Sequence, residues 1–147
     1  MITIFNCTKN TENLTPLERK ELFKYIDAYK DTPEGEWLKQ VAYRSVTYKW
    51  GKDLIGTDVM GIRPLTLDDD VIILQPSANP KDFWVQLMAS TAIHELRHIY
   101  QQMKYGLLVY SIMSIPSKIP FLYSISPLEV DAFKEQDTSN KLILKMQ

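Results

Sequence analysis

Both histidines of the chain lie in one pentapeptide, His94-Glu95-Leu96-Arg97-His98. Residues four apart share one face of a helix, so the imidazoles of His94 and His98 can bind a single metal ion. Glu95 would lie beside that ion without binding it. A carboxylate in that place can take a proton from a metal-activated water, which is the general-base role of the glutamate in the HExxH motif. The pentapeptide therefore predicts a zinc site that hydrolyses peptide bonds.

The alternative is that His94 and His98 are ordinary residues of a helix face, with Glu95 and Arg97 as solvated charges. The local sequence favours a helix, because apolar residues recur at three- and four-residue steps over residues 83–103. Projected at ~100° per residue, the two histidines fall on the flank of that apolar face. A second layer of the protein must therefore cover the histidines and complete the site.

A catalytic zinc site has three protein ligands and one open position. The chain has no third histidine, and its single cysteine, Cys7, is far away in the sequence. The remaining donors are carboxylates, and those that follow the histidine pair are Glu129, Asp131, Glu135 and Asp137. Glu129 comes at the start of a predicted helix, with Ser126 as N-cap and Pro127 at the first helical position.

Two roles for Glu129 remain open on spacing alone. Ser126-x-x-Glu129 is also a capping box, in which the glutamate would accept the backbone N–H of Ser126 instead of binding a metal. At this point the chain resembles the gluzincin peptidases, which carry HExxH on one helix and a ligand glutamate on a later helix, often followed by alanine at the third position, as Ala132 follows here. The resemblance makes Glu129 the third ligand. It is strongest over residues 71–133 and does not cover the first 50 residues.

The chain departs from that family at one position, and it also lacks a histidine that some members use. Some gluzincins have an aspartate four residues after the ligand glutamate, which hydrogen-bonds a histidine ligand, but Phe133 stands there and Asp131 is the alternative. Some also use a histidine to stabilise the oxyanion, so a tyrosine or arginine must serve here. Tyr123 is the candidate, with a packing role as the alternative. Arg97 is interpreted as a surface or second-layer charge.

Composition limits the class of protein. A length of 147 residues suits one domain. The net charge of -1 gives no electrostatic argument for nucleic acid, and we expect none to bind. A single cysteine excludes an intramolecular disulfide, and the first residues lack the pattern of a secretion signal. We therefore expect a cytoplasmic protein, of a size that suits a phage or mobile-element protein.

The segments before the motif predict helices and a small sheet. Residues 2–7 are expected to form a short strand. Thr15-Pro16 opens a helix that ends near Tyr29, and Thr32-Pro33 opens a second helix whose end is ambiguous, because residues 43–50 are rich in strand formers.

Residues 55–63 and 71–75 are predicted to pair as antiparallel strands. Between them, Asp68-Asp69-Asp70 is interpreted as a polar turn rather than a metal site. The order of elements predicts an α+β single domain, and the resemblance to gluzincins implies a zincin-like fold. In it a small antiparallel or mixed sheet packs on the HExxH helix, and a second helix bears the third ligand.

The uncharged, apolar segment 106–117 is too short for the ~20 residues of a membrane-spanning helix. The favoured interpretation is a buried or half-buried connection, with short helices, that leads to the Glu129 helix. The alternative is an apolar surface beside the metal that holds substrate side chains or touches a membrane. The sequence does not separate these two.

The resemblance implies a small single-domain metalloendopeptidase that acts on a protein or peptide, with Zn²⁺ held by His94, His98 and Glu129 and with Glu95 as the base. The alternative is a zinc-stabilised binding or structural protein on a peptidase scaffold. Glu95 favours the first, because a structural site needs no extra glutamate. The small size favours the second, because an isolated lobe lacks a wall to position a peptide.

Overall fold

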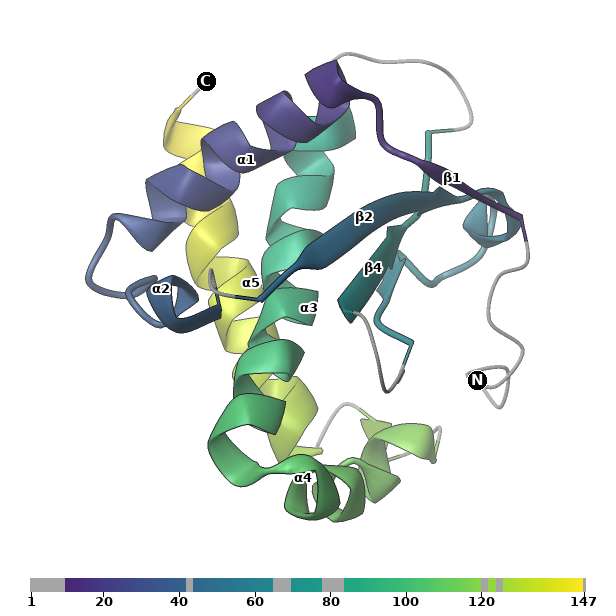
Figure 1. The fold of residues 1–147 in the computed structure, drawn as a ribbon, viewed down its shortest axis with the longest axis vertical. Coiled ribbons are helices and arrows are strands. Elements are labelled where there is room, and N and C mark those ends of the chain that lie inside the picture. Colours follow the sequence, from purple (N-terminus) through teal and green to yellow (C-terminus); the bar gives the residue numbers. More distant parts are fainter. Residues whose placement is uncertain are drawn as a thin grey trace.

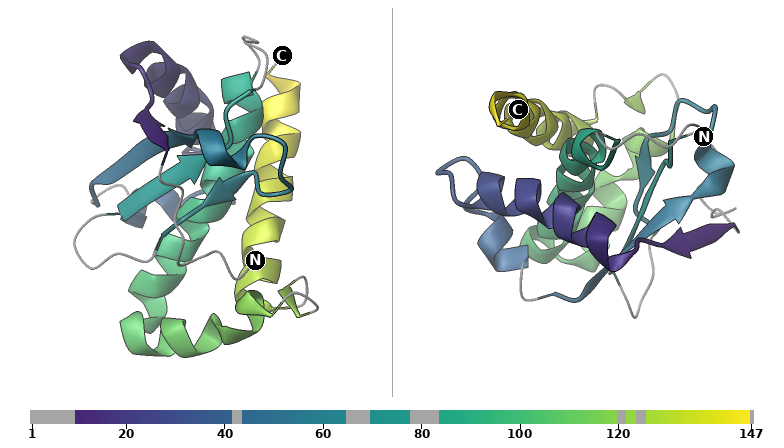
Figure 2. Two further views of the ribbon diagram at one scale, coloured as in Figure 1. Left: turned by 90° about the vertical axis from the view of Figure 1, so that its right-hand side faces the viewer. Right: turned by 90° about the horizontal axis from the view of Figure 1, so that it is seen from above.

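The computed structural model describes residues 10–41, 44–64, 70–77, 84–119, 122–123 and 126–146. They form an α+β fold in which a four-stranded mixed sheet packs against helices (Figure 1). The long helix α3, Trp84–Tyr105, lies between the sheet and the C-terminal helix α5, Pro127–Lys145 (Figures 1 and 2). The predicted fold class is confirmed, with a mixed sheet on the HExxH helix and a second helix that carries Glu129.

Helix α1, Pro16–Lys30, begins where the sequence predicts. The hydroxyl of Thr15 accepts the N–H of Glu18 at 3.2 Å, and the Glu18 carboxylate accepts the N–H of Thr15 at 2.8 Å. This capping box satisfies two N–H groups that the first turn leaves without helical partners. The helix packs on α3 with an apolar face made of Leu22, Tyr25, Ile26 and Tyr29.

The predicted second helix is much shorter than expected, since α2 spans only Leu38–Val41. The preceding residues form turns. The Thr32 hydroxyl accepts the N–H of Gly35 at 3.1 Å. A Cβ on Gly35 would lie 1.9 Å from the carbonyl oxygen of Tyr29, so the chain makes a close approach to α1 there that only glycine allows. That approach replaces the first turns of the predicted helix.

The strands pair in the order β1-β2-β4-β3. Strand β2, Val46–Gly51, is antiparallel to β1, Thr11–Asn13, and parallel to β4, Asp70–Leu74. Strand β3, Gly61–Ile62, is antiparallel to β4. The predicted antiparallel pair is therefore confirmed over two residues of β3, whereas the parallel β2–β4 pairing was not predicted. The strand expected at residues 2–7 lies outside the described residues.

Asp70 is not part of a polar turn, which corrects the interpretation of the aspartate run at that residue. It opens β4 as a buried carboxylate, 2.6 Å from Nε of Arg44 and 3.2 Å from Nη2 of Arg63. A buried carboxylate needs such partners, because burial of an unpaired charge is costly. Asp68 and Asp69 lie outside the described residues.

Helix α4, Leu107–Met113, and a 3₁₀ turn, Ile115–Lys118, follow α3 on the way to α5, at the bottom of Figure 1. Tyr110 faces inward and is buried, but most apolar side chains of this segment are exposed. The favoured interpretation of a buried or half-buried connection with short helices therefore holds in its half-buried form. In the described part of the chain, every helix is too short or too polar to cross a membrane.

Candidate metal centre

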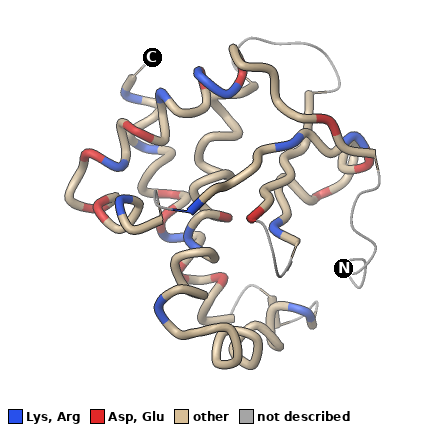
Figure 3. The backbone as a smooth tube through the Cα atoms, in the orientation of Figure 1, with Lys and Arg blue, Asp and Glu red and all other residues tan. Residues whose placement is uncertain are grey.

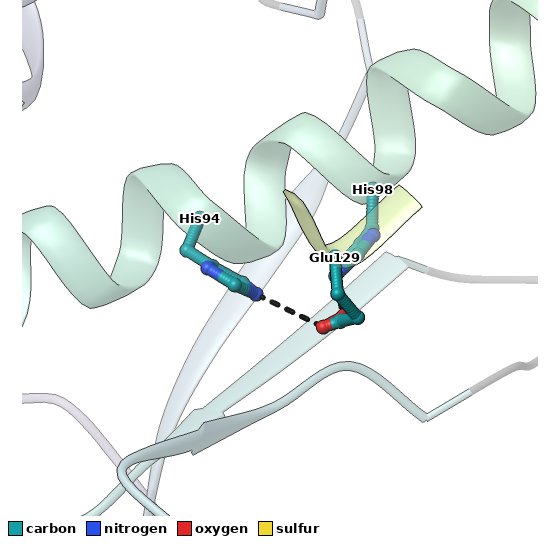
Figure 4. Close-up of side chains that lie close together, drawn as sticks. All are labelled: His94, His98 and Glu129. Carbon is teal, nitrogen blue, oxygen red and sulfur yellow. Dashed lines mark ion pairs between the residues drawn. The ribbon is translucent and has the colours of Figure 1, made fainter. Parts of the chain in front are cut away.

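The predicted ligands converge between α3 and α5 (Figure 4). His94 and His98 lie one turn apart on α3, and Glu129 lies in the first turn of α5. The three donor atoms are all within 4.8 Å of one another, and all three residues are buried. Nε2 of His98 is 2.6 Å from Oε1 of Glu129, and Nε2 of His94 is 3.5 Å from Oε2. Ala132, fully buried between the helices, leaves room for this approach.

Glu129 and Ser126 do not form the alternative capping box. The Ser126 side chain makes no capping hydrogen bond, and its Oγ is buried without a hydrogen-bond partner among the described residues. The Glu129 carboxylate points at the histidines instead (Figure 4). Its placement is compatible with a metal ligand.

The charges at the site favour a cation. Burial opposes the ionisation of Glu129, yet the imidazoles of His94 and His98 beside it hold its pKa well below its usual range. Oε2 of Glu129 is buried and has no hydrogen-bond partner among the described residues. An unsatisfied buried polar atom costs about 1–3 kcal/mol, and more when it is charged. A bound cation would remove that cost, so the donor set fits a metal ion.

Gln101 fixes the orientation of His98, and the sequence interpretation missed it. Nε2 of Gln101 donates to the carbonyl of Leu128 and to Oδ2 of Asp131, both at 2.9 Å. Its Oε1 must then accept from Nδ1 of His98, at 2.8 Å. This contact keeps a proton on Nδ1, so Nε2, which faces the Glu129 carboxylate, is the atom that would bind a metal. The available signal was a glutamine three residues after His98, on the same helix face.

Asp131 reaches the histidine only through Gln101. Its carboxylate is held by Arg97, with Nε at 2.7 Å and Nη2 at 3.1 Å. The guanidinium of Arg97 lies over the rings of Trp37 and Tyr100, 4.9 and 4.6 Å from their centroids. Arg97 thus joins α3 to α5 behind the histidines. This agrees with the second of the two predicted roles, a surface charge or a second-layer charge.

His94 is held by packing rather than by a carboxylate. The ring of Phe133 meets its imidazole edge to face, with the centroids 4.6 Å apart and the planes at 69°. Phe133 occupies the position where some gluzincins have the orienting aspartate. Nδ1 of His94 is buried and has no hydrogen-bond partner among the described residues.

Tyr123 lies next to the ligands. Its ring meets that of Phe133 edge to face, with the centroids 6.1 Å apart. Burial and the negative charges of Glu129 and Glu95 raise the pKa of Tyr123, so its hydroxyl stays protonated at neutral pH. The group can therefore donate a hydrogen bond. Its role toward an oxyanion stays a prediction.

Glu95 is buried, its charge acts on the imidazole of His98, and it lies next to the edge of the sheet. A Cβ on Gly61 of β3 would lie 2.7 Å from Cγ2 of Thr91 and 3.6 Å from Cγ of Glu95. Only a residue without a side chain lets the strand pass so near α3. Strand β3, the last strand in the described sheet order, therefore runs beside the HExxH carboxylate.

Comparisons with models of protein families, with curated proteins and with solved structures found no match. Within the described part of the chain, the functional signal is a buried group of two imidazoles and one carboxylate, with a second carboxylate adjacent. This group can bind a metal ion.

Substituting Gln101 tests the orientation of His98. We expect Gln101→Ala to lower metal affinity by about 10–100-fold, because the ring loses the acceptor that fixes its tautomer and direction. Affinity is measured by competition with a chromophoric chelator, and circular dichroism checks the fold. Gln136→Ala, a partly exposed glutamine on α5, is the control. Equal affinity of the Gln101 variant and wild type would show that the amide has no orienting role.

Proposed function

We propose that this chain is a small zinc-dependent metalloendopeptidase whose residues 1–147 form one zincin-like domain acting in the cytoplasm. The observation that carries the proposal is the convergence of His94, His98 and Glu129 with Glu95 beside them. Two imidazoles and one carboxylate are a ligand set of catalytic zinc. The 3.5 Å between Nε2 of His94 and Oε2 of Glu129 is close to the ~3.4 Å that separates two ligands of one tetrahedral zinc. The 2.6 Å between His98 and Glu129 is a hydrogen-bond distance, and it would widen around a bound ion.

The residues around the ligands supply the remaining steps of peptide hydrolysis. Bound zinc would lower the pKa of a water molecule toward ~7 and polarise the substrate carbonyl. Glu95 accepts the proton of the attacking water and passes it to the leaving amine. Tyr123 donates its hydroxyl hydrogen bond to the developing oxyanion, and its raised pKa keeps that proton in place.

The edge of the sheet offers a place for the substrate backbone. A peptide that pairs with β3 by strand addition would extend the sheet, because β3 has a described neighbour on one side only. Gly61 of that strand lies against Glu95. A substrate paired there would therefore pass close to the proposed base.

The second candidate is a protein in which zinc stabilises the fold and cleaves nothing. The observation in its favour is burial, since His94, Glu95, His98 and Glu129 are only 4–8% exposed. The cavity of about 260 Å³ beside α1 and β2 is lined by none of these four residues. In this candidate the metal contributes folding free energy alone.

Peptide cleavage separates the two candidates. Zinc-loaded protein is incubated with a proteome-derived peptide library, and new termini are identified by mass spectrometry. The peptidase proposal predicts termini that disappear on chelation and return when zinc is restored. If folded, zinc-loaded protein produces no new termini, the peptidase proposal is contradicted. The second candidate, in which zinc only stabilises the fold, would then remain.

A further inference from the structure

Helix α4 turns an apolar stripe outward. Leu108, Ile112 and Ile115 follow at intervals of four and three residues, and 75%, 58% and 53% of their surfaces are exposed. On the opposite side Tyr110 is buried, under the guanidinium of Arg63 at 5.8 Å. A surface helix usually buries its apolar residues, whereas most of those on α4 are exposed. We call the exposed set the apolar tip, and it consists of Leu107, Leu108, Val109, Ile112 and Ile115.

The sequence segment that carries the apolar tip has basic side chains and no acidic ones. The sequence has no aspartate or glutamate over residues 96–128. The exposed Lys104 and Lys118 stand on either side of α4 in the sequence. In Figure 3 this lower end of the molecule is mostly tan with isolated blue segments. Of the first carboxylates beyond the segment, Glu129 is buried between the histidines and Asp131 is paired with Arg97.

We propose that the apolar tip inserts shallowly into an anionic lipid surface, with Lys104 and Lys118 at the headgroups. Apolar side chains that enter the boundary between headgroups and acyl chains, together with basic residues beside them, are the two sources of peripheral membrane affinity. Tyr105, which ends α3 just before the apolar tip, is 39% exposed. Tyrosine is enriched at that boundary. This inference is independent of peptidase activity.

A second copy of the chain fits the apolar tip less well. Stable protein interfaces bury about 800 Å² on each partner and use roughly 20–30 residues a side. The tip offers one seven-residue helix and a short 3₁₀ turn. A two-fold interface would also bring Lys104 and Lys118 of one copy near those of the other. The charge pattern suits a phosphate-rich surface instead.

Vesicle sedimentation tests this proposal on the full chain. We expect the protein to pellet with phosphatidylcholine–phosphatidylglycerol vesicles at low salt, weakly with phosphatidylcholine alone, and less as salt screens the lysines. The double variant Leu108→Ser with Ile112→Ser should lower the partition coefficient at least about tenfold. The reason is that it removes two aliphatic side chains that would be buried in the lipid.

A matched control uses two equally exposed leucines at the opposite end of the molecule. Leu17 and Leu144 are 79% and 54% exposed, on α1 and near the end of α5 (Figure 1). The double variant Leu17→Ser with Leu144→Ser should bind vesicles as wild type does. Lys104→Gln with Lys118→Gln should reduce the preference for anionic lipid. Circular dichroism verifies the fold of each variant.

Three results would overturn the proposal. One is failure of wild type to bind anionic vesicles at low salt. Another is an equal loss of binding in the tip variant and in the control. The third is a dimer, detected by analytical ultracentrifugation, that the tip substitutions dissociate, which would assign the apolar tip to a second copy of the chain.

Discussion

Glu95→Gln is expected to abolish peptide cleavage while zinc content and fold stay unchanged. The amide has the size of the carboxylate but cannot accept a proton at neutral pH, and loss of a general base typically costs about 10²–10⁴-fold in rate. Zinc should stay, because the three donors that cluster are His94, His98 and Glu129. A loss of activity without a loss of metal is the expected signature of the base.

The measurement is kcat on a peptide identified in the library, with zinc per chain from elemental analysis. Glu135→Gln is the matched control, since Glu135 is also a buried glutamate. It accepts hydrogen bonds from the hydroxyl of Tyr29 and from Nε1 of Trp37, both at 2.7 Å. We expect that variant to unfold at lower temperature and to keep its kcat. Wild-type kcat in Glu95→Gln would refute the mechanism.

Glu129→Ala is expected to lower zinc affinity as much as His98→Ala does. Both substitutions remove a ligand, and the loss should be at least about a hundredfold, because residues that only support ligands already account for 10–100-fold. The two side chains lie 2.6 Å apart, so each also loses its partner. The expected equality distinguishes a ligand from a helix cap, whose removal would cost about 1 kcal/mol of stability and little affinity.

Elemental analysis and chelator competition on both variants measure this effect. Asp137→Ala, an exposed carboxylate on the same helix, should bind zinc as wild type does. If Glu129→Ala kept wild-type stoichiometry and affinity, the third ligand would have to be sought at Asp131 or beyond. Comparison with His94→Ala confirms that any metal detected is held at the histidine pair.

The ligand histidines could be placed from sequence because their geometry is local. Four residues on a helix bring His94 and His98 to one face whatever surrounds them. Pro127 likewise fixes the start of α5 and the position of Glu129 in its first turn. The choice between metal and cap for Glu129 depended on the approach of α5 to α3. That approach is tertiary, and sequence alone left it open.

Features that depend on distant partners were missed for the same reason. From sequence, Asp70 resembles a turn residue. Its partners in the fold, Arg44 and Arg63, come from other segments of the chain. The parallel pairing of β2 with β4 joins strands with no local signal for each other. Gln101 became recognisable as a partner of His98 only once Leu128 lay opposite its amide nitrogen.

The proposed ligands are divided between two helices, which would give a bound metal a mechanical role. An ion held by His98 on α3 and Glu129 on α5 closes a loop over residues 99–128, much as a covalent cross-link would. A cross-link around a loop of that size restricts the unfolded chain by about 3–4 kcal/mol. The same loop carries α4. Metal supply would therefore set how tightly α5 is clasped to the rest of the protein, and with it how long the folded chain survives proteolysis.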